Sequence, residues 1–136
     1  MEPCTLYVDG GCSGNAQKEQ SRRRMVAVVT DQSGVVLRDE SRDGGGSNNI
    51  AELWAVYLAL DWCVHHHIPD VLIYTDSQNN LSWVNGRLGK HLNNRRAVEA
   101  LQQIIRKRRQ RVTTMLKWIP REENLAGHVI EARYGL

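Results

Sequence analysis

The order of strand-like and helix-like segments limits the folds open to this chain. Three β-prone segments come first, at residues 4–9, at residues 25–30 and from residue 35 onward, the last two joined by a turn. After the glycines at 44–46, helical patterns alternate with short apolar segments. Strands joined by turns run antiparallel, whereas strands joined through helices run parallel. The pattern predicts an α/β fold: a five-stranded mixed sheet, three antiparallel strands then two parallel ones, flanked by helices.

Residues 10–21, which are polar and contain glycine, are expected to form a loop. At 136 residues the chain has about the size of one domain, so we expect a single domain over residues 1–136. After the glycines we expect a helix from Ser47 or Asn48 to about His66, a strand at 71–74, a short helix at 78–84, a basic helix at 95–110, a strand at 112–119 and a closing helix at 122–133.

Composition is that of a globular protein outside the membrane. No apolar run approaches the roughly 20 residues needed to span a bilayer, and the N-terminal residues lack the pattern of a secretory signal. The three cysteines are odd in number and show no CxxC spacing, which favours free thiols in a reducing compartment. We therefore expect a cytoplasmic protein, monomeric and without an obligate protein partner.

Positive charge is concentrated in two parts of the chain. Residues 22–24 are three arginines, and most of the other basic residues lie between positions 95 and 111. Such clusters form either a solvated face or a surface for a polyanionic partner.

Three acids occur where structural roles explain them poorly. Asp9 follows an apolar strand segment, Asp76 follows another, and Glu52 lies near the start of an apolar helix. Neighbouring parallel strands would place Asp9 and Asp76 side by side, with Glu52 above them. Converging carboxylates repel one another unless a cation lies between them, and such oxygen ligands suit Mg²⁺ or Mn²⁺.

These acids lie in segments that resemble the motifs of the type 1 ribonuclease H family. The segments are YVDGGCSGN (7–15), SNNIAEL (47–53) and YTDSQ (74–78), and WIPREEN (118–124) is similar to the stretch before the family's last active-site helix. The resemblance covers essentially the whole chain. It implies a ribonuclease H-like fold and hydrolysis of the RNA strand of an RNA–DNA hybrid, giving 5′-phosphate and 3′-hydroxyl ends.

The resemblance also implies the metal chemistry. Two divalent ions would act together, one activating the attacking water and one stabilising the leaving oxygen. By resemblance Asp9 bridges both ions, Asp76 ligates the ion beside the nucleophile, and Glu52 ligates the other ion, near the 2′-hydroxyl that distinguishes RNA from DNA.

Residues that hold the hybrid are implied in the same way. The minor-groove contacts carry over to Gly10, Cys12, Asn15, Asn48, Asn49 and Gln78. For Asn48 and Asn49 helix capping is the alternative.

Trp83 either lies against the DNA strand or belongs to the core. Many family members carry a basic protrusion here, but this chain has only the short segment 83–91, so affinity is expected to depend on residues 95–111.

The fourth active-site position departs from the family pattern. The family has an aspartate about four residues after the asparagine of the PREEN-type stretch, and counting from Asn124 reaches His128. His128 is therefore the expected fourth catalytic and metal-binding residue, with Mn²⁺ preferred over Mg²⁺ because imidazole ligates Mg²⁺ poorly. Glu131, one turn further on, is one alternative, and an inert surface helix at the C-terminus is the other.

Two other functions remain open from the sequence. The first, suggested by the missing acid, is a catalytically weak or silent member that only binds hybrids or a protein partner. A recombination nuclease or transposase core of the wider fold is the second, although the SNNIAEL and YTDSQ segments argue against it.

Overall fold

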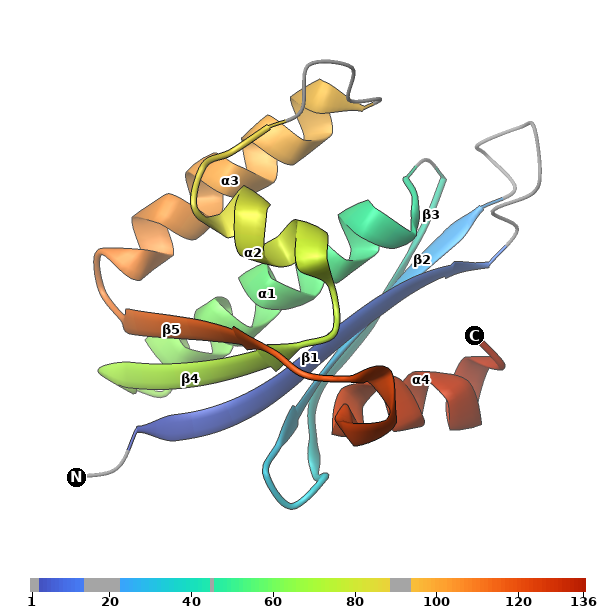
Figure 1. The fold of residues 1–136 in the computed structure, drawn as a ribbon, viewed down its shortest axis with the longest axis horizontal. Helices are drawn as coiled ribbons and strands as arrows, with labels where there is room; N and C mark the ends of the chain where they lie inside the picture. Colours follow the sequence, from blue (N-terminus) through green and yellow to red (C-terminus); the bar gives the residue numbers. More distant parts are fainter. Residues whose placement is uncertain (1–2, 14–22, 45, 89–93) are drawn as a thin grey trace.

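The fold was analysed in a computed structural model, which describes residues 3–13, 23–44, 46–88 and 94–136 (Figure 1). Five strands and four α-helices follow one another in nearly the expected order. The elements are β1 (Cys4–Ser13), β2 (Arg24–Asp31), β3 (Val36–Asp43), α1 (Asn48–His65), β4 (Asp70–Thr75), α2 (Gln78–Val84), α3 (Arg95–Arg109), β5 (Thr113–Trp118), a 3-10 turn (Arg121–Glu123) and α4 (Leu125–Tyr134).

The strands form one mixed sheet in the order β3-β2-β1-β4-β5. β2 pairs antiparallel with both β1 and β3, whereas β4 pairs parallel with β1 and β5 pairs parallel with β4. The predicted ribonuclease H-like fold class, with three antiparallel strands followed by two parallel ones, is confirmed.

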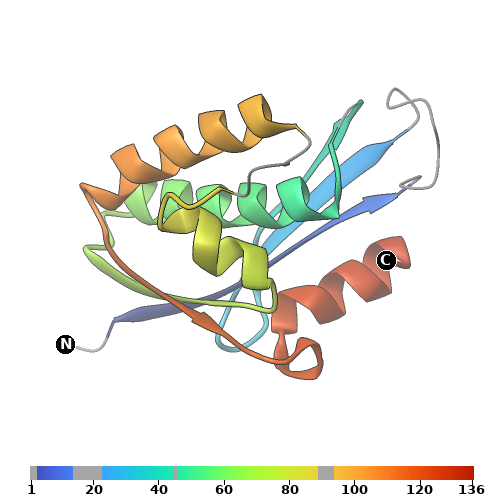
Figure 2. The ribbon, with the colours of Figure 1, turned by 45° about the horizontal axis from the view of Figure 1, so that its top comes forward.

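Helices cover both faces of the sheet (Figure 2). α1 packs on one face, where Leu6 and Val8 of β1 join Leu53 and Val56 of α1 in the main core, and α3 packs on α1 as an outer layer. α4 packs on the other face, where Ile130 meets apolar side chains of β2. Because side chains alternate along a strand, successive residues of β1 face α1 and α4 in turn.

β1 is longer than predicted, because the strand continues through residues 10–13 rather than ending at Asp9. Gly10 pairs with Ala27 and Ser13 pairs with Arg24, so the ladder with β2 holds this polar, glycine-containing segment extended. Asp9 therefore lies within a strand, not at its end. The closing helix is also shorter than expected, since Arg121–Glu123 form a separate 3-10 turn before α4.

α1 begins where its capping residue predicts. The Ser47 hydroxyl accepts a hydrogen bond from the Ile50 N–H at 3.3 Å, which satisfies one of the free donors of the first turn. Ser47 is thus the N-cap.

None of the helices found in the described ranges is long and apolar enough to cross a membrane. All three cysteines, Cys4, Cys12 and Cys63, are free thiols, as expected.

Candidate active site

The register between β1 and β4 brings Asp9 and Asp76 together. The parallel pairing ends at Tyr7 and Tyr74, and each aspartate lies two residues beyond that pair, where the two strands separate. Carboxylate oxygens of Asp9, Asp76 and Glu52 all lie within 4.8 Å of one another. The structure therefore unites the three acids that the sequence singled out.

Glu52 joins the aspartates because α1 touches the backbone of β1. A Cβ atom placed on Gly10 would lie only 2.2 Å from the carbonyl carbon of Ala51 and 2.4 Å from the nitrogen of Glu52. Only glycine allows this approach. The contact sets the start of α1 directly over the strand residue that follows Asp9.

The environment of the acids favours their protonated forms in the absence of a cation. Burial raises the pKa of Asp9 to about 8, and the charges of Asp76 and Glu52 add to the rise. Burial likewise raises the pKa of Glu52 to about 7, with a further contribution from Asp76. Arg121 opposes both shifts. Carboxylates that are costly to ionise together form a strong site for a divalent cation, which removes that repulsion.

Asn124 holds Asp76 in place. The Asn124 side chain is fully buried, and its amide donates to the Val8 carbonyl oxygen at 3.0 Å and to Asp76 Oδ2 at 3.1 Å. Its Oδ1 accepts from the Ala126 N–H at 3.1 Å and caps α4. One side chain thus ties α4 to β1 and to a carboxylate. Sequence reasoning used Asn124 only as a counting point, although its place before an apolar helix was a capping signal.

The start of α2 supports Glu52. The Ser77 hydroxyl hydrogen-bonds the Glu52 carboxylate and also accepts from the Asn80 N–H at 3.2 Å. The buried Asn80 amide donates to the Glu52 carbonyl oxygen at 3.1 Å and to Thr75 Oγ1 at 3.0 Å. α1, β4 and α2 are therefore joined directly behind the carboxylates.

Arg121 is a member of the site that sequence reasoning missed. It lines the same pocket of about 190 Å³ as the three acids and lowers the pKa of Asp9 and Glu52. Its Nη2 donates to the Leu136 carbonyl oxygen at 2.9 Å, and Leu136 also lines the pocket. The one sequence feature that could have pointed to Arg121 was its position in the WIPREEN segment.

The residues predicted to hold a substrate divide into three groups. Three of them line the carboxylate pocket: Gly10, Cys12 and Asn48. Asn48 Oδ1 accepts a hydrogen bond from the Cys12 N–H at 2.7 Å. The rest of the Asn48 side chain is exposed. Asn49 and Gln78 are exposed but do not line that pocket. Asn15 lies outside the described residues.

His128 does not join the acids. It is exposed, and its Nε2 donates to the Glu122 carbonyl oxygen at 2.7 Å. Gly127 of α4 lies against the acids instead, since a Cβ atom placed there would be 3.2 Å from Asp9 Oδ2. Glu131 is exposed as well. Within the described ranges, neither His128 nor Glu131 lies close enough to Asp9, Glu52 and Asp76 to share a metal ion with them.

Trp83 belongs to the core. Its side chain is 5% exposed and packs within the main cluster, so little of its ring is available to a nucleic acid.

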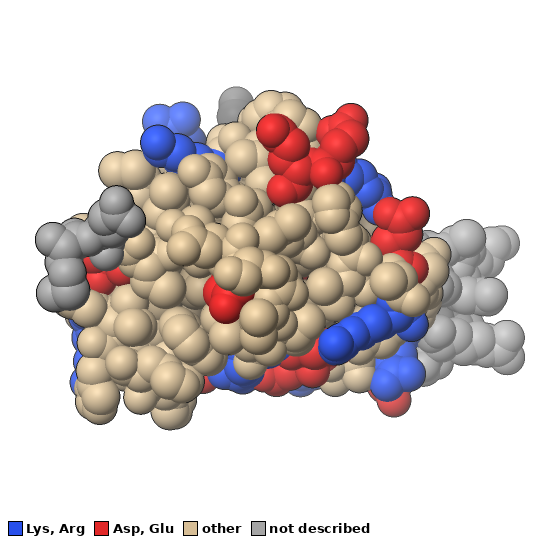
Figure 3. All heavy atoms as spheres, turned by 90° about the horizontal axis from the view of Figure 1, so that it is seen from below, with Lys and Arg blue, Asp and Glu red and all other residues tan. Residues whose placement is uncertain are grey.

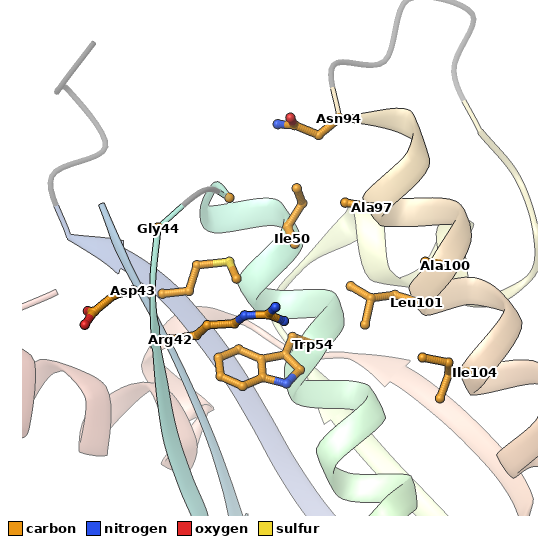
Figure 4. Close-up of a pocket in the computed structure, with 12 residues that line it drawn as sticks. Arg42, Asp43, Gly44, Ile50, Trp54, Asn94, Ala97, Ala100, Leu101 and Ile104 are labelled. Atoms are coloured by element: carbon orange, nitrogen blue, oxygen red, sulfur yellow. The ribbon is translucent and has the colours of Figure 1, made fainter. Parts of the chain in front are cut away.

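A larger pocket of about 550 Å³ lies elsewhere, between the end of β3, α1 and α3 (Figure 4). Arg42 and Trp54 extend side by side into it, and Ala97 and Leu101 of α3 form the opposite wall. Among the described residues, Asp43 is the one acid that lines it. Within these residues the pocket therefore offers no group of carboxylates for a metal ion.

The profile of the reverse transcriptase-like family matches residues 8–130, which is nearly the whole chain and includes all three acids. The chain belongs to this family. Its ribonuclease H-like character, inferred from the three sequence motifs, is thereby confirmed. None of the curated proteins compared with the chain is significantly similar to it.

Solved structures of ribonucleases H1 are similar to this reverse transcriptase-like chain. RNase H1 from the halophilic archaeon Halobacterium salinarum superposes with a TM-score of 0.69 at 19% identity, over 99% of this chain and 100% of that one. LC11-RNase H1, isolated from compost by a metagenomic approach, has a TM-score of 0.63 at 25% identity, over 96% and 93% of the two chains. Its complex with an RNA/DNA hybrid has a TM-score of 0.59 at 25% identity, over 89% of this chain and 88% of that one.

Proposed function

We propose that the chain is a divalent-metal-dependent ribonuclease H that hydrolyses the RNA strand of RNA–DNA hybrids. The observation that carries the proposal is the group of Asp9, Glu52 and Asp76, whose oxygens converge within 4.8 Å in a member of this family. The LC11-RNase H1 crystallised with an RNA/DNA hybrid, 25% identical to this chain, supports the choice of substrate.

The donor set fits hard divalent cations. Three carboxylates supply only oxygen ligands, which Mg²⁺ and Mn²⁺ prefer, and a divalent cation would offset the burial and mutual repulsion that raise the pKa values of Asp9 and Glu52. When bound, a pair of such ions would supply an activated water and stabilise the leaving 3′ oxygen, which gives 5′-phosphate and 3′-hydroxyl products.

The chain's own groups would orient the substrate and the ligands. Asn124 and Asn80 fix Asp76 and the main chain of Glu52 through hydrogen bonds, so that the carboxylates are preorganised. The exposed side chain of Asn48, which bonds the Cys12 main chain and lines the pocket with Gly10, would contact the minor groove. Contacts there with 2′-hydroxyls would distinguish RNA from DNA.

The proposal is tested with a labelled hybrid, incubated separately with Mg²⁺ and Mn²⁺. We expect shortened RNA, intact DNA and no cleavage of a DNA duplex of the same sequence. Asp9→Asn should reduce cleavage by roughly 100-fold or more, because it removes a group that acts in the transition state, while hybrid binding is largely kept.

The second candidate function is a hybrid-binding protein without catalytic activity. The position of His128 favours it, since the exposed ring bonds the Glu122 carbonyl oxygen and adds no ligand to the three acids. In the same assay this function would give a retarded but intact hybrid with both metals, and Asp9→Asn would then match the wild type.

A further inference from the structure

A second pocket, which we call the α2–α3 pocket, lies between the last turn of α2 and the C-terminal half of α3. It has a volume of about 400 Å³, and its polar wall consists of Asn85, Gln102, Arg106, Arg109 and Gln110. Two arginines and three amide residues line this space, and no acidic residue does so within the part of the chain that the structure describes. The wall therefore has the composition of an anion site.

The basic residues of α3 have different partners. Arg108 turns inward to the buried Asp61, with Nη2 3.4 Å from Oδ1, and Arg95 pairs with Glu99 at 2.8 Å. Arg106 is exposed and forms no ion pair among the residues that the structure describes. Its Nη2 reaches to within 3.8 Å of a Cβ atom placed on Gly86, across the mouth of the pocket. Arg106 is thus a cation without an internal counter-charge.

One face of α3 lies toward α2. Gln102, Arg106 and Arg109 lie at intervals of four and three residues, so that they share a face. Gln102 Nε2 donates to the Trp83 carbonyl oxygen at 2.8 Å, and Arg109 Nη1 donates to the Val84 carbonyl oxygen at 3.2 Å. These bonds satisfy the carbonyls at the C-terminal end of α2, whose partial negative charge would otherwise repel an anion.

α2 connects the carboxylates to this pocket. It begins at Gln78, two residues after Asp76, and ends at Val84 on the pocket wall. Seven residues rise by about 10 Å in an α-helix, which is comparable to the 6–12 Å width of a duplex groove. A duplex with one strand at the carboxylates would therefore have its other strand near the pocket.

The charge distribution points to the same side of the molecule. The face seen from below the sheet, with α4 and the β2–β3 hairpin, is mainly uncharged, and its basic side chains lie near the edges (Figure 3). α3 lies on the opposite side and carries four basic residues in its last turn alone. A polyanion is thus attracted toward α3 rather than toward α4.

We propose that the α2–α3 pocket binds a backbone phosphate of the DNA strand, with Arg106 as the principal donor and Arg109 as the second. This inference rests on the proposed function, because the hybrid places its RNA strand at the carboxylates. Such a contact depends on the charge and position of the phosphate and not on the base sequence. It therefore contributes to affinity and fixes the register of the protein on the hybrid.

The test compares Arg106→Gln with Lys107→Gln, a matched control that removes the same charge from the next residue, which does not line the pocket. Hybrid affinity is measured by fluorescence anisotropy over a range of salt concentrations. Arg106→Gln should weaken binding roughly tenfold and reduce the salt slope by about one phosphate contact, because a charge-assisted hydrogen bond is lost. Lys107→Gln should stay close to the wild type. Equal effects of the two substitutions would overturn the inference.

The strand is identified with hybrids that carry a single uncharged methylphosphonate at successive positions. One position on the DNA strand should weaken binding of the wild type but not weaken Arg106→Gln further. If the sensitive position lies on the RNA strand, or if the two effects simply add, the pocket does not bind a DNA phosphate. Cleavage by the wild type is followed in parallel. If the wild type cuts the hybrid while Arg106→Gln binds normally, only this inference fails, whereas a wild type that neither binds nor cuts contradicts the proposed function itself.

Discussion

The side-chain amide of Asn80 donates a hydrogen bond to the carbonyl oxygen of Glu52 at 3.1 Å. Asn80 is fully buried, and the same amide donates to Thr75 Oγ1 at 3.0 Å, on the strand that leads to Asp76. One buried side chain therefore sets the distance between the helix that carries Glu52 and the strand end that carries Asp76.

Removing this link should loosen the site as well as the fold. We expect Asn80→Ala to lower the free energy of unfolding by about 2–3 kcal/mol, since buried hydrogen bonds are lost and the Glu52 carbonyl is left without its partner. Cleavage should fall through kcat rather than through KM. Chemical denaturation and steady-state kinetics measure both, with the exposed neighbour Asn79→Ala as the control for stability. An Asn80→Ala protein with normal stability would contradict the proposed role.

The stability of the metal-free protein should decrease as pH rises from about 4 to about 8. The pKa of Asp9 is raised from 3.8 to about 8 and that of Glu52 from 4.5 to about 7, so the folded state holds protons that the unfolded state releases in this range. Stability therefore falls as pH rises, until the pH exceeds the pKa values of Asp9 and Glu52 in the folded state. Thermal unfolding in EDTA across this range measures the effect. Asp9→Asn should flatten the decline, and saturating Mg²⁺ should reverse it; a stability that rises across this range in EDTA would contradict the raised pKa values.

The role of His128 at the fourth active-site position can be tested with Mg²⁺ and with Mn²⁺. We expect His128→Asp to increase Mg²⁺-dependent cleavage, because a carboxylate offers Mg²⁺ an oxygen ligand, which it prefers to the nitrogen of imidazole. His128→Ala should lower activity if the ring turns from the Glu122 carbonyl oxygen toward a bound ion, and the loss should be larger with Mn²⁺. Metal titrations of these variants and of Glu131→Gln measure this. If His128→Ala matches the wild type while Glu131→Gln loses activity, Glu131 is the fourth ligand.

Gly10 should tolerate no side chain, in contrast to its neighbour. A Cβ atom on Gly10 would lie 2.2 Å from the Ala51 main chain, whereas one on Gly11 would meet side chains alone, with Leu136 Cδ1 at 3.2 Å and Ile130 Cγ2 at 3.8 Å. We expect Gly10→Ala to cost about 3 kcal/mol or more and Gly11→Ala about 1 kcal/mol or less. Thermal unfolding of the two variants measures the difference. Equal costs would mean that α1 and β1 can move apart.

The convergence of the acids was predictable because each aspartate directly follows an apolar segment of a strand, although β1 itself continues beyond Asp9. Asp9 and Asp76 follow β-prone segments that pair in parallel, so their proximity follows from topology alone. The continuation of β1 through Gly10 was missed, because local composition indicates a loop while pairing with β2 holds the segment extended.

The supporting residues were not predictable from patterns. Periodicity says which face of an element is buried, but it does not say that the Asn124 amide reaches Val8 or that Arg121 faces the acids. The same limit applies to α4. Counting residues led to His128, whereas the rotation of the helix brings Gly127 against Asp9.

The bond from Asn124 to Val8 joins residues 116 positions apart in the chain. During synthesis the strands and helices that carry the three acids leave the ribosome well before α4, the last helix in the sequence, does. The acids can therefore approach one another in an unfinished chain, but Asp76 gains its Asn124 partner only when α4 docks. The aligned carboxylate group is thus completed late in folding, and a nascent or C-terminally trimmed chain would carry the acids without the Asn124 hydrogen bond that positions Asp76.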